Sequence, residues 1–96
     1  MNLPIDKQTV LITGAGRGLG SEIAKSFHRE GAKVIINYRN SFECAKKLHD
    51  SLGENVILLK GDIREHDQVS KMQKVLEGQN IRVDSIILLK PYLLLY

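Results

Sequence analysis

A glycine-rich segment directly after a short β-branched run is the feature that most constrains this chain. Residues 9–13 read Thr-Val-Leu-Ile-Thr and predict a buried strand, and residues 14–20 continue as Gly-Ala-Gly-Arg-Gly-Leu-Gly. Gly14 permits a tight turn out of the strand, because glycine adopts backbone angles that other residues avoid. Gly18 lets the backbone approach a ligand closely, and Gly20 lets the following helix pack tightly on the strand. The segment therefore predicts a phosphate-binding turn that opens a helix, whose free N–H groups attract anions.

The spacing of these glycines separates the turn from two other phosphate-binding loops. The G-x-G-x-x-G pattern requires a glycine where this chain has Leu19, and the Gly-Lys-Ser/Thr ending of nucleoside triphosphate loops is absent. The pattern that fits is T-G-x-x-x-G-x-G. We therefore expect the binding turn to comprise Gly14, Ala15, Gly16, Arg17, Gly18, Leu19 and Gly20. A glycine-rich loop that binds no ligand is the alternative.

Helical and strand patterns alternate along the rest of the chain. Helices are predicted over about 18–30, 40–52 and 65–77, and strands over 33–38, 56–59 and 83–89. Asn40 and Glu43 fit a capping box at the start of the second helix. This alternation predicts an α/β fold with a doubly wound parallel sheet in strand order 3-2-1-4, and a ligand at the switch point between strands 1 and 4.

Length and composition exclude several classes of protein. The 96 residues suffice for one small domain, and an apolar fraction of 43% argues against disorder. The net charge is +3, and the 14 Lys and Arg residues are spread along the chain without interleaved aromatics, so we expect no nucleic-acid partner. The N-terminus lacks the apolar region of a signal peptide, and the stretch Ile86–Tyr96 is too short and too interrupted to span a membrane.

Cysteine and histidine usage narrows the chemistry further. Cys44 is the single cysteine, so no internal disulfide can form, and a reducing cytoplasm is the expected location. His28, His49 and His66 lie at no metal-ligand spacing, so we expect no metal site.

The end of the second predicted strand indicates which dinucleotide would fit. At this place an acidic residue hydrogen-bonds the 2′-hydroxyl of the adenosine ribose, whereas a basic residue accommodates a 2′-phosphate. The segment Tyr38, Arg39 and Asn40 contains no acid. Arg39 can form a bidentate contact to a phosphate, and Arg17 is near enough in the glycine turn to join it. These residues predict a preference for NADP(H) over NAD(H); the alternative is that each arginine is only solvated.

The glycine turn and several later segments resemble the short-chain dehydrogenase/reductase family. The resemblance runs from about Lys7 to Ile87 and includes residues 31–34, 38–40, 61–63 and 83–86. The branch that looks most similar is that of the 3-oxoacyl-acyl-carrier-protein reductases. The resemblance implies a Rossmann-type fold and hydride transfer between a nicotinamide dinucleotide and a carbonyl or alcohol group. It also implies a homo-oligomer for an intact version, while the oligomeric state of this chain is left open.

The residues after the third predicted strand have a role in the resemblance as well. It implies that Asp62 accepts a hydrogen bond from the exocyclic amine of adenine while Ile63 covers the ring. Asp62 could instead cap the next helix, since aspartate is a favoured N-cap residue. Both roles for Asp62 stay open at this point.

The resemblance ends abruptly after the fourth predicted strand. Where the family has Asn-Asn-Ala-Gly, residues 88–91 read Leu-Leu-Lys-Pro, and no Ser and Tyr-x-x-x-Lys set follows. No catalytic residue is therefore assigned, and the chain alone is expected to be inactive. We expect a dinucleotide-binding half-domain over 1–89, with its sheet truncated after the fourth strand, and an aberrant hydrophobic tail over 90–96. The hypothesis for this ending is a frameshift, a truncation or a split gene, and the apolar strand edge predicts low stability and self-association.

Three functions are compatible with these observations. The chain is the N-terminal half of an oxidoreductase, a non-catalytic module that holds a nicotinamide dinucleotide, or a non-functional product of a frameshifted gene. Titration with NADPH separates the second from the third.

Overall fold

Strands and helices alternate along the chain, as the sequence predicts. The computed structural model describes residues 3–16 and 18–89. A short 3-10 helix at Ile5–Lys7 precedes the first strand. The strands are β1 (Thr9–Thr13), β2 (Lys33–Tyr38), β3 (Val56–Lys60) and β4 (Ser85–Ile87), and the helices are α1 (Gly18–Arg29), α2 (Phe42–Leu52) and α3 (His66–Gly78).

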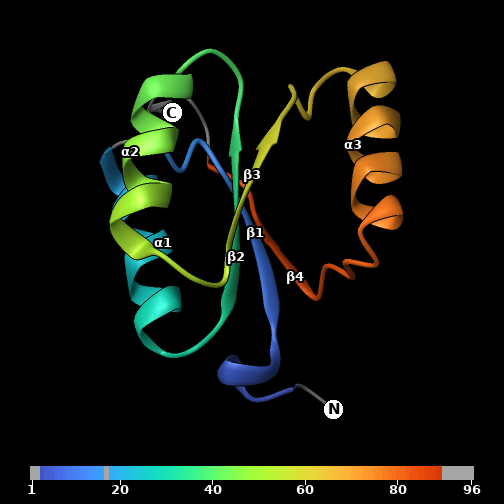
Figure 1. Ribbon diagram of the computed structural model, residues 1–96. Helices are drawn as coiled ribbons and strands as arrows, with labels where there is room; N and C mark the ends of the chain where they lie inside the picture. The colour runs from blue at the N-terminus through green and yellow to red at the C-terminus, as the bar shows by residue number, and fades with distance from the viewer. Residues whose placement is uncertain (1–2, 17, 90–96) are drawn as a thin grey trace, which may run out of the picture.

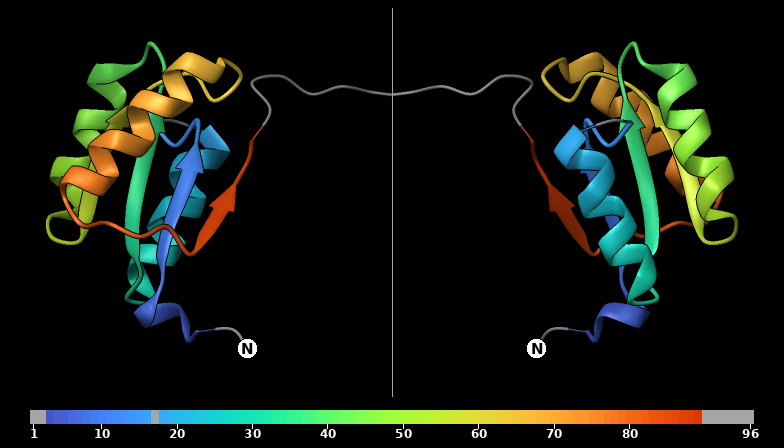
Figure 2. Two further views of the ribbon diagram at one scale, coloured as in Figure 1. Left: turned by 90° about the vertical axis from the view of Figure 1, so that its right-hand side faces the viewer. Right: turned by 90° about the vertical axis from the view of Figure 1, so that its left-hand side faces the viewer.

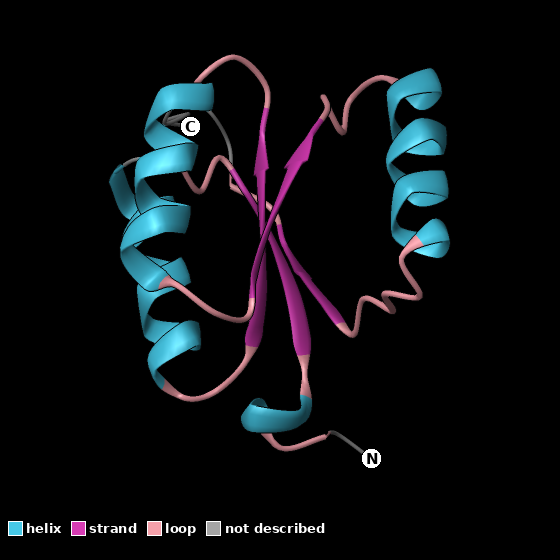
Figure 3. Cartoon of the chain, in the orientation of Figure 1, coloured by secondary structure: helices cyan, strands magenta, loops and turns pink. Residues whose placement is uncertain are grey.

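The strands of the described residues form one parallel sheet in the order β3-β2-β1-β4. Helices α1 and α2 cover one face of this sheet and α3 covers the other, as Figures 1 and 3 show. Parallel strands with helices on both faces are the doubly wound α/β arrangement. The predicted fold class and strand order are therefore confirmed.

The core lies in two layers because neighbouring residues of a strand point to opposite faces of the sheet. In β1, Val10 and Ile12 pack in the layer under α1 and α2, whereas Leu11 packs in the layer under α3. The α3 layer is the smaller, and it is closed by Met72 and Leu76 of that helix. Buried strands with apolar residues on both faces explain why these segments read as continuous hydrophobic runs.

The start of α2 differs from the prediction. The helix begins at Phe42 and its N-cap is Ser41, with no side-chain hydrogen bond at the cap. The expected capping box of Asn40 and Glu43 is therefore wrong. Asn40 lies in the exposed turn that carries the chain out of β2, one residue too early to cap the helix.

The fourth strand is shorter than the predicted range 83–89. At its start the Asp84 carboxylate accepts a hydrogen bond from the Thr9 N–H at 2.9 Å. Beyond its end the Thr13 hydroxyl oxygen accepts from the Leu89 N–H at 2.7 Å. Side-chain hydrogen bonds thus flank β4 on both sides; at its start they accompany a backbone bond from the Asp84 N–H to the Thr9 carbonyl at 2.9 Å. Three residues are in strand pairing.

The outer edge of β4 carries exposed apolar side chains. Among the described residues β4 pairs with β1 alone, and it lies at the margin of the sheet in Figure 2. Ile86 is 59% exposed and Leu88 is 65% exposed. The apolar edge expected from the sequence is therefore present, whereas the tail predicted over 90–96 lies outside the described residues.

Candidate functional site

The glycine turn leaves the carboxyl end of β1 and enters α1. Gly14 and Gly18 both have φ of 63°, in the left-handed region that favours glycine. A Cβ at either position would meet no atom within 4 Å. The outer surface of the turn is therefore open, and a ligand can approach its backbone there.

The other two glycines of the turn face the protein interior. A Cβ on Gly20 would overlap the carbonyl group of Gly14, so only glycine lets α1 pack this closely on the turn. A Cβ on Gly16 would lie 3.3 Å from the backbone nitrogen of Ala45 in α2. The four glycines thus have two tasks: two shape the inner packing and two keep the outer surface clear.

The remaining turn residues divide in the same way. Ala15 is fully buried, whereas Leu19, in the first turn of α1, is 70% exposed. Arg17 lies outside the described residues. The first N–H groups of α1 have no partner within the helix, so this end carries the partial positive charge that an anion requires.

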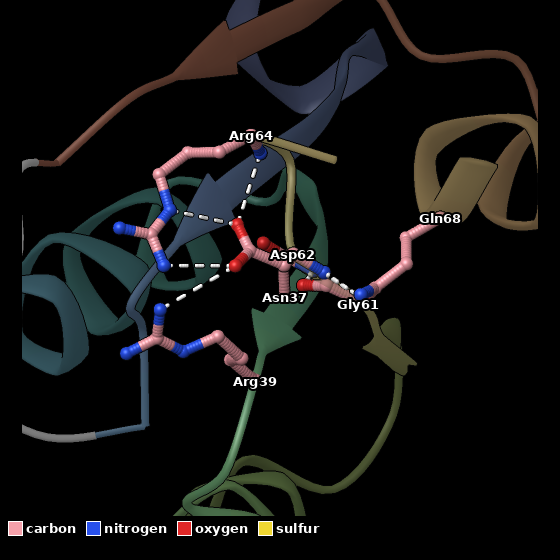
Figure 4. A network of polar contacts seen from close by, with 6 residues as sticks. All are labelled: Asn37, Arg39, Gly61, Asp62, Arg64 and Gln68. Carbon is pink, nitrogen blue, oxygen red and sulfur yellow. Dashed lines mark hydrogen bonds and ion pairs between the residues drawn. The ribbon is translucent and has the colours of Figure 1, made fainter. Parts of the chain in front are cut away.

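Asn37 joins the glycine turn to the neighbouring strands. Its backbone carbonyl accepts a hydrogen bond from the Gly14 N–H at 3.1 Å. Its side-chain amide donates to the carbonyl oxygens of Leu59 at 3.0 Å and Gly61 at 3.1 Å. The side chain is almost completely buried. Asn37 therefore holds the ends of β1, β2 and β3 in one arrangement, as Figure 4 shows in part.

Asp62 follows β3 and is held firmly in place. Its backbone N–H donates to the Gln68 side-chain oxygen at 2.7 Å. Its carboxylate oxygen Oδ1 accepts from the backbone N–H of Arg64 at 2.9 Å and from Arg64 Nε at 3.0 Å. The other oxygen, Oδ2, accepts from Arg64 Nη2 at 2.8 Å and Arg39 Nη1 at 3.4 Å. Figure 4 shows both guanidinium groups converging on this one carboxylate.

These contacts bear on the two roles left open for Asp62. It does not cap α3, because the N-cap of that helix is Glu65. A carboxylate has about four acceptor positions, and the two arginines already contact all of them here. An adenine amine could be bound only by displacing a guanidinium. Ile63 is half-buried and packs against the core layer under α3, so only the rest of its side chain is accessible to a ligand.

The end of β2 offers one aromatic and two polar side chains. The half-buried Tyr38 ring packs against Phe42, with ring centroids 5.8 Å apart. Arg39 and Asn40 are exposed. A shallow open depression next to them is lined by Asn40, Ser41, Phe42, Glu43 and Cys44. The segment 38–40 therefore lies beside the glycine turn, with the Asn40 side chain exposed and the Arg39 side chain exposed but in contact with Asp62.

Three residues of this site were not foreseen from the sequence: Asn37, Arg64 and Gln68. The signal for Arg64 was available, because an Asp-x-Arg spacing after a strand lets the arginine fold back onto the carboxylate. Asn37 gave no signal, since an asparagine within a strand shows its partners only when the neighbouring strand ends are placed.

Two expected absences can be examined over the described ranges 3–16 and 18–89. No group of three or more His, Cys, Asp and Glu side chains there is arranged to hold a metal ion. Within the same ranges, no helix has the length and apolar character needed to cross a bilayer.

Comparisons with known proteins agree with this geometry. The family model described as short chain dehydrogenase matches residues 8–88. Versicolorin reductase stcU of Emericella nidulans is 40% identical over 74 residues, which are 74% of this chain and 28% of that protein. Trihydroxynaphthalene reductase of Colletotrichum orbiculare is 41% identical over 68 residues, which are 68% of this chain and 24% of that protein.

Solved structures show the same fold. A 3-ketoacyl-(acyl-carrier-protein) reductase from Brucella melitensis, complexed with NADH, superposes with a TM-score of 0.73 at 31% identity and covers 83% of this chain. A short chain dehydrogenase from Bacillus anthracis superposes with a TM-score of 0.81 over 92% of this chain, at 24% identity. The matched region spans 32% and 36% of those two proteins. This chain thus corresponds to about a third or less of the proteins it resembles.

Proposed function

This chain belongs to the short chain dehydrogenase family, and we propose that it is the NADP(H)-binding N-terminal portion of an oxidoreductase that acts on carbonyl or alcohol groups. The observation that carries the proposal is the open glycine turn, fixed by Asn37 beside the ends of β2 and β3. A nicotinamide dinucleotide, when bound, supplies or accepts a hydride. The residues of this chain bind and orient it.

The residues that would hold the dinucleotide lie along one edge of the sheet. The turn of residues 14–20 offers backbone N–H groups to the pyrophosphate, and the clear space over Gly14 and Gly18 admits it. The segment 38–40 would meet the adenosine ribose. Asp62 and Ile63 would lie beside the adenine, where a guanidinium would have to give way before the Asp62 carboxylate could accept from the adenine amine. The glycine turn follows β1, which neighbours β4 at the switch point of the sheet, where ligands of this fold class bind.

The preference for NADP(H) rests on charge. Segment 38–40 carries no acid, and Arg39 presents an exposed guanidinium that can bind a 2′-phosphate. Asp62 lies beside Arg39, but its carboxylate is occupied by Arg64, so it does not confer the acidic character that favours NAD(H). Arg17 would add a second positive charge from the turn.

We further propose that these 96 residues alone do not reduce a carbonyl substrate. Reduction needs a proton donor at the carbonyl oxygen, and the sequence has no Tyr-x-x-x-Lys set after the fourth strand. A half-domain over 1–89 with an aberrant tail over 90–96 fits this proposal. Several of the proteins it resembles are named reductases, including a 3-ketoacyl-(acyl-carrier-protein) reductase, which supports a reductase role. A cytoplasmic location accords with the single, free Cys44.

A non-catalytic binding module and a non-functional product of a frameshifted gene are the other candidates. Calorimetric titration of the chain with NADPH and NADH separates them. We expect NADPH to bind more tightly, and Arg39→Gln to reduce NADPH affinity about tenfold while changing NADH affinity little. Arg29→Gln, at the exposed far end of α1, is the matched control.

Each contrary result has a distinct meaning. Equal affinity for NADH and NADPH would overturn the preference for NADP(H). No binding of either dinucleotide at millimolar concentration would overturn the binding function and favour the non-functional product.

A further inference from the structure

Asp62 and its two arginines form an unequal cluster at the carboxyl ends of β2 and β3. Arg64 contacts the carboxylate with its backbone N–H at 2.9 Å, Nε at 3.0 Å and Nη2 at 2.8 Å. Arg39 makes one longer contact, from Nη1 at 3.4 Å. The Asp62 side chain is 11% exposed, whereas those of Arg39 and Arg64 are 47% and 57% exposed. One nearly buried carboxylate is therefore shared by two accessible cations, and Arg64 holds most of it.

The backbone of Asp62 is held in place beside Arg39. Its backbone N–H is bound to the Gln68 side chain at 2.7 Å, and the preceding Gly61 carbonyl is bound to Asn37 at 3.1 Å. Without a second partner, this fixed carboxylate would bind Arg39 through both oxygens, because a bidentate arginine–carboxylate pair is the stronger geometry. It would also repel an approaching phosphate. The negative charge must therefore be neutralised locally if Arg39 is to serve an anion.

From these contacts we propose that Arg64 is a positioning residue that neutralises Asp62 and so leaves Arg39 available for the 2′-phosphate of the dinucleotide. This inference rests on the proposed function and assigns the cofactor preference to one more residue. With Arg64 present the cluster has two positive charges and one negative. Without it the charges of this cluster of Arg39, Asp62 and Arg64 balance, and Arg39 is paired with Asp62. Arg64 acts through Asp62 and Arg39, with no contact to the nucleotide required.

The test uses the full chain and two nucleotides that differ only in the group concerned. Calorimetry gives the dissociation constants of 2′,5′-ADP, which has the 2′-phosphate, and of 5′-AMP, which lacks it. We expect Arg64→Gln to lower the selectivity for 2′,5′-ADP about tenfold, the effect of removing one charge beside a phosphate dianion at an exposed site. Arg64→Lys, which keeps the charge but not the forked contact, should give an intermediate loss.

The deciding variant is Asp62→Asn. Any effect of this change on adenine binding is common to 2′,5′-ADP and 5′-AMP, so it cancels in the ratio of their dissociation constants. Once the carboxylate is gone, Arg64 has nothing to neutralise, so Asp62→Asn should retain that ratio and Arg64→Gln should cause no further loss of it in that background. Arg82→Gln is the matched control, because the Arg82 side chain is 90% exposed and lies near Asp84, 3.7 Å from its carboxylate, before β4. Far-UV circular dichroism verifies that each variant keeps its secondary structure.

Several outcomes would overturn the inference. If Arg64→Gln lowers selectivity equally with and without Asp62→Asn, Arg64 contacts the phosphate directly. If both nucleotides bind but Arg64→Gln leaves the ratio of their dissociation constants unchanged, the inference alone fails. An equal weakening of 5′-AMP and 2′,5′-ADP would then show that the role of Arg64 is structural. If the unaltered chain binds neither nucleotide, the proposed function fails, and this inference fails with it.

Discussion

Replacing Asn37 by aspartate tests whether one buried amide holds the site together. The amide nitrogen donates two hydrogen bonds, at 3.0 Å to Leu59 and 3.1 Å to Gly61. Asn37→Asp leaves the size of the side chain almost unchanged, but it replaces the donating amide nitrogen by an oxygen. This oxygen is an acceptor, and it faces two carbonyl oxygens. The side chain is 3% exposed, so water cannot compensate.

The expected cost follows from these two contacts. Each hydrogen bond contributes about 1 kcal/mol net, and a buried acceptor left without a donor costs about 1–3 kcal/mol more, so Asn37→Asp should destabilise the chain by about 3–5 kcal/mol at pH 7. A chain of 96 residues has a free energy of unfolding of roughly 5–14 kcal/mol. The variant should therefore lose a large share of its stability.

The pH dependence gives the effect a signature. Burial and the facing carbonyls raise the folded-state pKa of the introduced carboxyl above its unfolded value of about 3.9. An acid whose pKa is raised on folding destabilises the native state above that folded pKa. As pH falls from the folded to the unfolded pKa, the part of the penalty that comes from ionisation decreases by about 1.4 kcal/mol per pH unit, and this part vanishes below the unfolded pKa. One of the two hydrogen bonds is then restored by the neutral carboxyl.

Urea unfolding at pH 8 and pH 4.5, followed by circular dichroism, measures both effects. Asn40→Asp is the matched control. It is the same chemical change at an exposed residue in the turn that follows β2. The control should change stability by less than about 0.5 kcal/mol. A loss below about 1 kcal/mol for Asn37→Asp, or an identical pH response in both variants, would refute the reasoning.

Three further predictions concern packing, charge and association. Gly20→Ala should destabilise the chain by about 2 kcal/mol or more in thermal unfolding, because the added Cβ would overlap the turn. Gly78→Ala, whose added Cβ would meet open space, should leave the stability unchanged or raise it slightly in the same measurement. The hydrogen bond from Lys46 lowers the pKa of Asp50, so Lys46→Gln should raise that pKa in an NMR titration. Any stability that the pair contributes is present above the unfolded pKa of Asp50, and it is lost as pH falls through the lowered folded pKa. Ile86→Lys should reduce concentration-dependent self-association at the β4 edge in sedimentation velocity, and a chain that stays monomeric at all concentrations without the substitution would contradict the role of that edge.

The amino-acid sequence by itself determined the fold class and the place of the site. Hydrophobic runs in the strands and the helical spacing between them are local patterns, and parallel pairing with helices on both faces is the arrangement that buries them. The glycine turn was equally visible, since a left-handed φ at Gly14 and Gly18 and close packing at Gly20 are requirements that only glycine meets.

Only the tertiary structure decided how the polar side chains of the site are paired. Asp62 lies 23 positions from Arg39 along the chain, and their contact arises because parallel strands β2 and β3 end at the same edge of the sheet. The partners of Asn37 and the side-chain hydrogen bonds on both sides of β4 have the same origin. A local pattern specifies which face of an element is buried, but a hydrogen bond between distant residues depends on strand order and register, which exist only once the sheet has formed.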